Sequence, residues 1–128
     1  MADVNRRLDI ARQALRTLEE LDLGSDDPVI RDAAIQRFEY TFEAVWKAAQ
    51  AVLRERFGVA LASPKPVIRA CHENGLLDEA EARLALAMVD HRNLTAHTYN
   101  QALAEEIYAA LPDYRRLLHT WLARLEAA

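Results

Sequence analysis

Side chains suited to anion binding and proton transfer are concentrated in one short segment, residues 92–99, which reads Arg-Asn-Leu-Thr-Ala-His-Thr-Tyr. An arginine can hold a phosphate through two parallel hydrogen bonds, and a histidine can gain or lose a proton near neutral pH. Such polar residues are poor helix formers, and a plain connection between two amphipathic helices does not need so many of them. The segment is therefore the first candidate for a functional site, with Arg92 and His97 as its active pair.

Arg92 ends an apolar stripe and should face a protein interface instead of solvent. It is in helical phase with the apolar residues Ala85, Met88 and Val89. A guanidinium in such a place needs an anion. The sequence leaves three sources open, namely Asp90, a partner subunit and a bound phosphate.

The spacing of Arg92 and His97 places a condition on the site. A separation of five residues turns the second side chain about 140° away from the first on an ideal helix. The two share a face only if the helix unwinds near Thr95. A two-fold axis nearby would also bring the same pair from a second copy into one cleft.

Other chemistries find less support in the sequence. A metal site built from Asp90, His91 and His97 matches neither the His-Glu-x-x-His spacing nor any cysteine-based zinc spacing, so no metal is expected. The chain has no glycine-rich phosphate loop and no Gly-x-Ser-x-Gly turn, and we expect no cofactor. Its single cysteine, Cys71, is expected to be a small buried residue.

The elements that position this segment are predicted to be helices. Apolar residues recur at steps of three and four along most of the chain, and glycine and proline mark the boundaries. Gly24 is expected to end the first helix in the left-handed conformation, Asp78 and Glu81 to form a capping box, and Pro112 to kink or briefly break the last helix. The expected helices cover about residues 3–22, 28–57, 64 to before Gly75, 78–92, and 100 to the end.

This pattern predicts an all-α fold, an antiparallel up-and-down helical bundle of four long helices plus one short helix. The 128 residues have the size of one domain, so we expect residues 1–128 to form a single unit. The aromatic stripe Phe38, Phe42 and Trp46 should lie in the core, with a groove for a partner helix as the alternative.

Composition limits the range of functions. The net charge of −4 argues against a broad nucleic-acid-binding face, so any contact with RNA must be local. The chain has no long uncharged apolar run, which predicts no membrane span. With one cysteine and no leader-like start, the expected location is the cytoplasm.

The segment 92–99 resembles the Arg-x-x-x-x-His-x-Tyr signature of HEPN-domain proteins encoded beside minimal nucleotidyltransferases. Further similarity to the branch named nucleotidyltransferase substrate-binding proteins covers about residues 30–110. Where many members have serine before the histidine, this chain has Ala96. The other matching positions are Phe38-Glu39, Phe42-Glu43, Trp46-Lys47, Ser63-Pro64, Val67-Ile68-Arg69 and Ala104-Glu105-Glu106-Ile107-Tyr108.

The resemblance implies a homodimer that joins Arg92 and His97 of both copies into one metal-independent endoribonuclease site. Asn93 and Thr95 would support the pair. The protein would be the toxin of a two-gene pair, and Tyr99 would receive AMP from a minimal nucleotidyltransferase, the antitoxin, which would block access of RNA. The alternative is a non-catalytic substrate-binding subunit of a nucleotidyltransferase. A purely structural helical adaptor would leave the polar segment unexplained.

Overall fold

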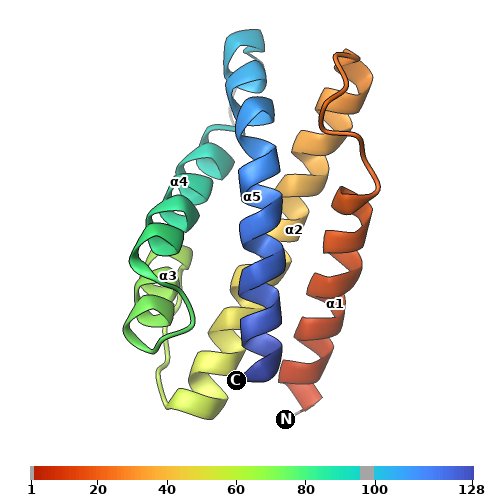
Figure 1. Cartoon of the computed structure of the whole chain (residues 1–128). Coiled ribbons are helices and arrows are strands. Elements are labelled where there is room, and N and C mark those ends of the chain that lie inside the picture. Colours follow the sequence, from red (N-terminus) through yellow and green to blue (C-terminus); the bar gives the residue numbers. More distant parts are fainter. Residues whose placement is uncertain (1, 96–99) are drawn as a thin grey trace.

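The computed structural model describes residues 2–95 and 100–128, and within them every regular element is an α-helix (Figure 1). His97 and Tyr99 lie outside the described residues. The predicted all-α fold is confirmed. The helices are α1 Ala2–Glu19, α2 Pro28–Phe57, α3 Pro64–Glu73, α4 Glu79–Thr95 and α5 Gln101–Ala127.

The four long helices alternate in direction, and α1, α2 and α5 lie together while α3 and α4 pack along one side (Figure 1). Helix α2 contacts α1, α3 and α5, and α4 reaches the bundle through α3 and α5. This arrangement agrees with the predicted bundle of four long helices and one short one. It also places the end of α4, with Arg92, beside α2 and α5.

Most helix ends follow from the local sequence. The Asp27 carboxylate accepts the Val29 amide at 2.9 Å before Pro28, and Gly58 ends α2 in the left-handed region with φ 69°. The predicted capping box is confirmed, because the Asp78 amide donates to Glu81 and the Glu81 amide donates to Asp78, each at 2.8 Å.

The predicted end of the first helix is wrong. Helix α1 stops at Glu19, and among the described residues only Gly58 and Gly75 have a positive φ, so Gly24 does not close it. The Gly24 amide instead donates to the Asp22 carboxylate at 2.9 Å. The helical bonding pattern is lost before this side-chain turn, because the Leu21 amide already bonds to the Leu18 carbonyl three residues earlier.

Of the two expectations for the last helix, a kink or a brief break at Pro112, the break is not found. Helix α5 runs through Pro112 without a break. Leu111 and Tyr114, on either side of the proline, are both buried in the core. Their packing holds the two halves of α5 in one helix although proline removes a backbone hydrogen bond.

The aromatic stripe of α2 is core, as predicted. Phe38 and Phe42 are completely buried and Trp46 nearly so. Cys71 is buried as well, and this burial raises the pKa of its thiol to about 11, so it is an inert packing residue.

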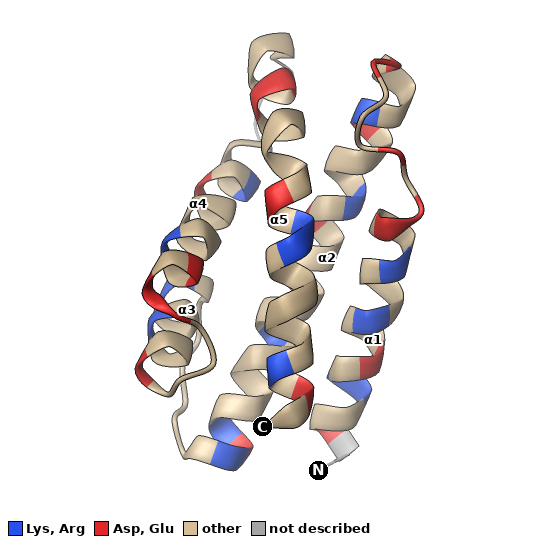
Figure 2. Cartoon of the chain, viewed as in Figure 1, with Lys and Arg blue, Asp and Glu red and all other residues tan. Residues whose placement is uncertain are grey.

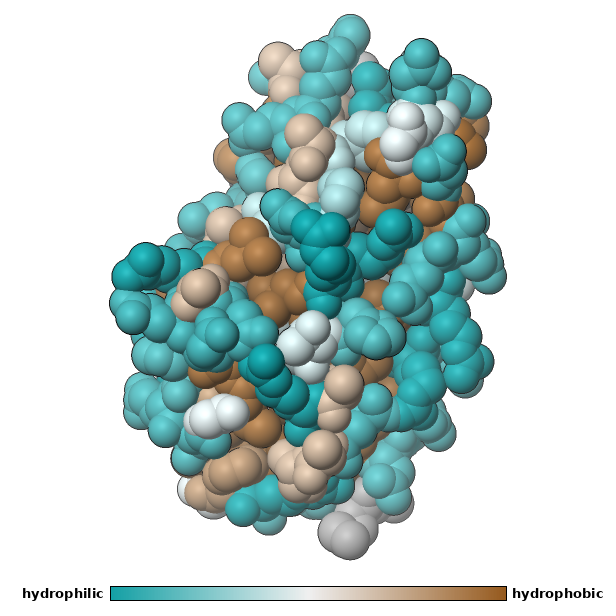
Figure 3. All heavy atoms as spheres, in the orientation of Figure 1, coloured by the Kyte–Doolittle hydropathy of each residue, from teal (hydrophilic) through white to brown (hydrophobic). Residues whose placement is uncertain are grey.

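Lys and Arg are interspersed with Asp and Glu along the helices drawn in Figure 2. On the face seen in Figure 3, hydrophobic residues form small patches between hydrophilic ones. None of the described helices is both long and apolar enough to cross a membrane.

Candidate functional site

The last turn of α4 carries the described part of the predicted site. Arg92, Asn93 and Thr95 belong to this turn, and α5 begins at Gln101 after the Asn100 cap. His97 and Tyr99 fall between the two described ends, so their distances to Arg92 stay predictions.

The anion beside Arg92 is Glu43 from α2. The Glu43 Oε1 atom lies 2.8 Å from Arg92 Nε. This nitrogen has almost no exposed surface, and its N–H does not point at an acceptor well enough to form a hydrogen bond. The contact is therefore an ion pair between two partly exposed side chains. The expectation that Asp90 could supply the anion is wrong, because Asp90 points to Lys65 Nζ at 2.9 Å. Asp90 precedes Arg92 by two residues, and side chains two apart on a helix do not face each other.

Glu43 is itself held in place by the aromatic stripe. The Trp46 indole donates from Nε1 to Glu43 Oε2 at 3.1 Å, which leaves the other oxygen for Arg92. The Arg92 guanidinium carbon lies 5.8 Å from the centre of the Phe42 ring, within the range of a cation–π contact. Sequence reasoning missed the role of Glu43. The available signal was a carboxylate between two aromatic residues of an otherwise apolar stripe.

Two predicted supporting residues act on Arg92 directly. Arg92 Nη1 donates to Asn93 Oδ1 at 2.9 Å, and Thr95 Oγ1 donates to the Arg92 carbonyl at 2.8 Å. The first contact orients the guanidinium. The second gives the Arg92 carbonyl, in the last turn of α4, a side-chain donor.

His91, immediately before Arg92, joins α4 to α5. Its Nε2 lies 2.9 Å from Glu106 Oε2 and its Nδ1 lies 2.7 Å from the Tyr114 hydroxyl. Burial, followed by the charges of Asp90 and Glu106, raises the pKa of Tyr114 to about 12, so the phenol keeps its proton. In a neutral His91 the phenol therefore donates to Nδ1 and Nε2–H donates to Glu106.

These contacts involve two of the residues that were considered as metal ligands, Asp90 and His91. Both ring nitrogens of His91 are engaged, and Asp90 is paired with Lys65. In the parts of the chain that the structure describes, no three His, Cys, Asp or Glu side chains are grouped to hold a metal ion. His91 is thus placed as a structural link beside Arg92.

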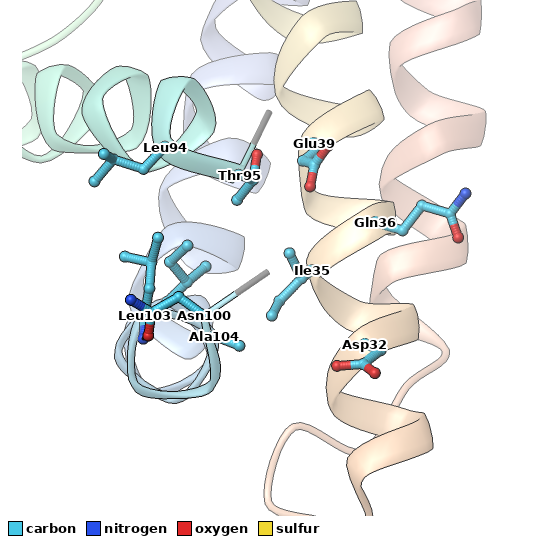
Figure 4. A pocket seen from close by; sticks show the side chains of 10 residues that line it. Asp32, Ile35, Gln36, Glu39, Leu94, Thr95, Asn100, Leu103 and Ala104 are labelled. Carbon is cyan, nitrogen blue, oxygen red and sulfur yellow. The ribbon is translucent and has the colours of Figure 1, made fainter. Parts of the chain in front are cut away.

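A cavity of about 220 Å³ opens where α2, α4 and α5 meet, next to both described ends of the segment 92–99 (Figure 4). Thr95 and Asn100 line it from the two ends, and the Asn100 side chain caps α5 by accepting the Leu103 amide at 3.1 Å. Ile35 and Leu103 form part of its apolar wall, while Asp32 and Glu39 contribute carboxylates. A cavity with this charge does not suit a phosphate, so we do not place RNA there.

The described residues form a helical bundle with Arg92 at the centre of its candidate site. The sequence matches one protein family over residues 6–127. The chain belongs to the family described as "Nucleotidyltransferase substrate binding protein like". This confirms the predicted membership in the nucleotidyltransferase substrate-binding branch. A search of curated proteins finds no match.

Solved structures with the same fold include a crystal structure of a protein from Thermus thermophilus. It is 62% identical, with a TM-score of 0.85, over 90% of this chain and 98% of that one. A chain of the mutant toxin–antitoxin complex MntA-HpeT is 15% identical, with a TM-score of 0.78, over 100% of both chains. A chain of the complex between a tri-AMPylated Shewanella oneidensis HEPN toxin and MNT antitoxin is 14% identical, with a TM-score of 0.73, over 98% of this chain and 97% of that one. At 14–15% identity, the likeness to the two toxin–antitoxin structures concerns the fold alone.

Proposed function

We propose that the chain is the HEPN toxin of a two-gene pair, a metal-independent endoribonuclease whose site is completed by dimerisation. The observation that carries the proposal is Arg92, whose guanidinium is held between Glu43, Asn93 and the Phe42 ring at the very end of α4. An arginine fixed by three neighbours is ready to meet a phosphate at little further entropic cost. The family membership and the folds of the two toxin–antitoxin structures add support.

In this mechanism His97 takes the proton of a ribose 2′-hydroxyl. The 2′-oxygen then attacks the adjacent phosphorus, the bond from phosphorus to the 5′-oxygen breaks, and the departing oxygen receives a proton from the second copy's imidazolium. The products are a 2′,3′-cyclic phosphate and a 5′-hydroxyl. Arg92 stabilises the negative charge that develops on the phosphate oxygens, and Asn93 releases Nη1 to the phosphate as it binds.

The decisive experiment uses the purified chain and a single-stranded RNA in EDTA. The proposal expects cleavage that leaves cyclic phosphate ends, carried out by a protein whose mass in solution is that of a homodimer. Because the mechanism uses only protein side chains, the chelator should not reduce the rate. A monomer, or a protein that leaves the RNA intact at every concentration tested, would contradict it.

Silencing is proposed to occur at Tyr99. Its phenol oxygen would attack the α-phosphate of ATP held by a minimal nucleotidyltransferase, with release of pyrophosphate and of the phenol proton. The attached AMP adds bulk and negative charge two residues from His97 and repels RNA.

We therefore expect Tyr99→Phe to cleave RNA as the unmodified wild type does but to stay active after incubation with the nucleotidyltransferase and ATP. Intact-mass spectrometry and cleavage assays on the same samples measure both effects. Wild-type protein should gain AMP and lose activity. The mechanism is wrong if the phenylalanine variant gains AMP, or if the wild type gains none and is silenced nonetheless.

The second candidate is a non-catalytic subunit that presents a substrate to a nucleotidyltransferase in the cytoplasm. The net charge of −4 and the family's own description favour it. It expects a stable complex with the nucleotidyltransferase, no cleavage of RNA, and no growth arrest when the chain is expressed alone. The toxin hypothesis expects arrest that the co-expressed nucleotidyltransferase relieves.

A further inference from the structure

A second surface feature lies on the other side of Glu43, in the seam between α1 and α2. It is a groove of about 250 Å³ lined by Arg7, Ile10, Tyr40, Glu43, Ala44 and Lys47, here called the α1/α2 groove. The α2 residues follow one another at steps of three and one, and so form a single stripe on that helix. The groove and the Arg92 site share Glu43, which lines the first and pairs with the second.

The groove exposes an aromatic ring in a fixed orientation. Tyr40 and Ile10 retain 41% and 46% of their surface, and they are two of only five large hydrophobic residues exposed in the described chain. The Tyr40 hydroxyl is hydrogen-bonded to Thr17 Oγ1 on α1. The ring is thus tethered at its polar end, while part of its surface stays open to a ligand.

Cations frame this ring. Lys47 is exposed and forms no ion pair with any residue in ranges 2–95 and 100–128. Arg7 approaches the Asp3 carboxylate only at 3.7 Å, and Asp3 is shared with Arg6 at 2.9 Å and Arg54 at 3.4 Å. One carboxylate therefore serves three guanidinium groups, which leaves positive charge available.

The charges that line the groove favour an anionic ligand although the whole chain is acidic. Two cations, Arg7 and Lys47, stand against one carboxylate, Glu43. Glu43 is already matched by Arg92 at 2.8 Å. Stacking surface together with backbone-directed cations is the combination by which proteins bind single-stranded nucleic acid without reading its sequence.

We propose that the α1/α2 groove binds a single-stranded RNA segment next to the phosphate held at Arg92, with a base stacked on Tyr40 and backbone phosphates at Lys47 and Arg7. The assignment of RNA as the ligand rests on the proposed function. On α2 the groove extends about one turn to either side of Glu43, from Tyr40 to Lys47. None of its lining residues lines the acidic cavity near Asp32, so a strand leaving Arg92 can follow it without crossing that cavity. It supplies the local contact that an acidic protein needs in order to hold RNA.

The test measures binding of a fluorescent 2′-O-methyl oligouridylate to the full chain by anisotropy. This probe lacks the 2′-hydroxyl nucleophile, so it reports binding whether or not the protein is a nuclease. Tyr40→Ala is expected to weaken binding on the order of 5- to 150-fold, the range for loss of one stacked base. Lys47→Ala should reduce the slope of log K against log salt concentration by about 0.7.

Arg83→Ala is the matched control. Arg83 is an exposed cation of α4 that pairs with Glu79 one turn away, far along the chain from the groove. Its loss should change neither the affinity nor the salt slope by a comparable amount. Helicity by circular dichroism and mass in solution should stay at wild-type values in all three variants.

The outcomes separate this inference from the proposed function. Weakened binding by the groove variants supports the groove even if the wild type cleaves no RNA, in which case only the nuclease assignment fails. Unchanged binding by the groove variants of a protein that does cleave RNA overturns the groove and leaves the nuclease intact. No measurable binding by the wild type also overturns it. A change of oligomeric mass, or loss of the nucleotidyltransferase complex, in Tyr40→Ala overturns it in favour of a protein interface.

Discussion

Arg92→Ala should lower kcat/KM for RNA cleavage on the order of 100- to 1000-fold, the range seen when one donor to a developing oxyanion is removed. Arg92→Lys should recover little of this loss. Lysine keeps the charge but lacks the planar fork that contacts Glu43 and Asn93 at once. His97→Ala, which removes the proposed proton carrier, should cost about 100- to 10,000-fold.

Stability distinguishes this result from a general loss of structure. The Arg92–Glu43 pair is partly exposed, with side-chain exposures of 27% and 37%, so its removal should cost at most about 1 kcal/mol of unfolding free energy. Glu43 would keep its hydrogen bond from Trp46. Cleavage rates and urea midpoints should be measured on the same preparations, with Arg83→Ala as a charge-matched control. Undiminished cleavage by both Arg92→Ala and His97→Ala would remove the catalytic assignment.

The sequence was informative about the fold because its local signals agree with the tertiary packing. Asp27-Pro28, Gly58 and the Asp78 capping box each fix a helix end through interactions that span a few residues. The aromatic stripe of α2 is buried, as its periodicity predicts. Gly24 shows the limit of this reasoning, since the Asp22 side chain two residues away diverts its amide and the helix has already ended.

The site was only partly predictable, and the reason is distance along the chain. The polar residues around Arg92 are concentrated in one segment, so the sequence itself locates them. Glu43 lies nearly fifty residues earlier, and only the packing of α2 beside α4 brings its carboxylate to the guanidinium. The His91–Tyr114 contact has the same origin, because a histidine and a tyrosine on separate helices carry no joint sequence signal.

These long-range contacts connect the core to the site. Phe38 stacks on Tyr114 with ring centres 5.3 Å apart, Tyr114 bonds to His91, and His91 adjoins Arg92 in α4. The stripe that stabilises the bundle therefore also positions the end of α4. A substitution in the core should first lower the stability of the bundle and second displace the guanidinium of Arg92.

Phe38→Ala is accordingly expected to lower the free energy of unfolding by about 3–5 kcal/mol, the usual cost of emptying a buried phenylalanine site. Phe38 is completely buried and contacts both Phe42 and Tyr114, so neighbouring rings cannot fill the space without leaving their own positions. Against a total stability of roughly 5–15 kcal/mol for a domain, the loss is large. Urea denaturation at one fixed protein concentration measures it, because dimerisation would otherwise shift the midpoint.

Two further variants separate packing from hydrogen bonding. Val29→Ala, at a position that is 73% exposed, should change stability by no more than about 0.5 kcal/mol. Tyr114→Phe keeps the ring against Phe38 but removes the hydroxyl from His91, which should cost about 1 kcal/mol. A cost for Phe38→Ala no larger than that for Tyr114→Phe would contradict the prediction. Phe38→Ala is expected to be the most damaging by far because it empties a completely buried site, whereas Tyr114→Phe removes one hydrogen bond and keeps the ring.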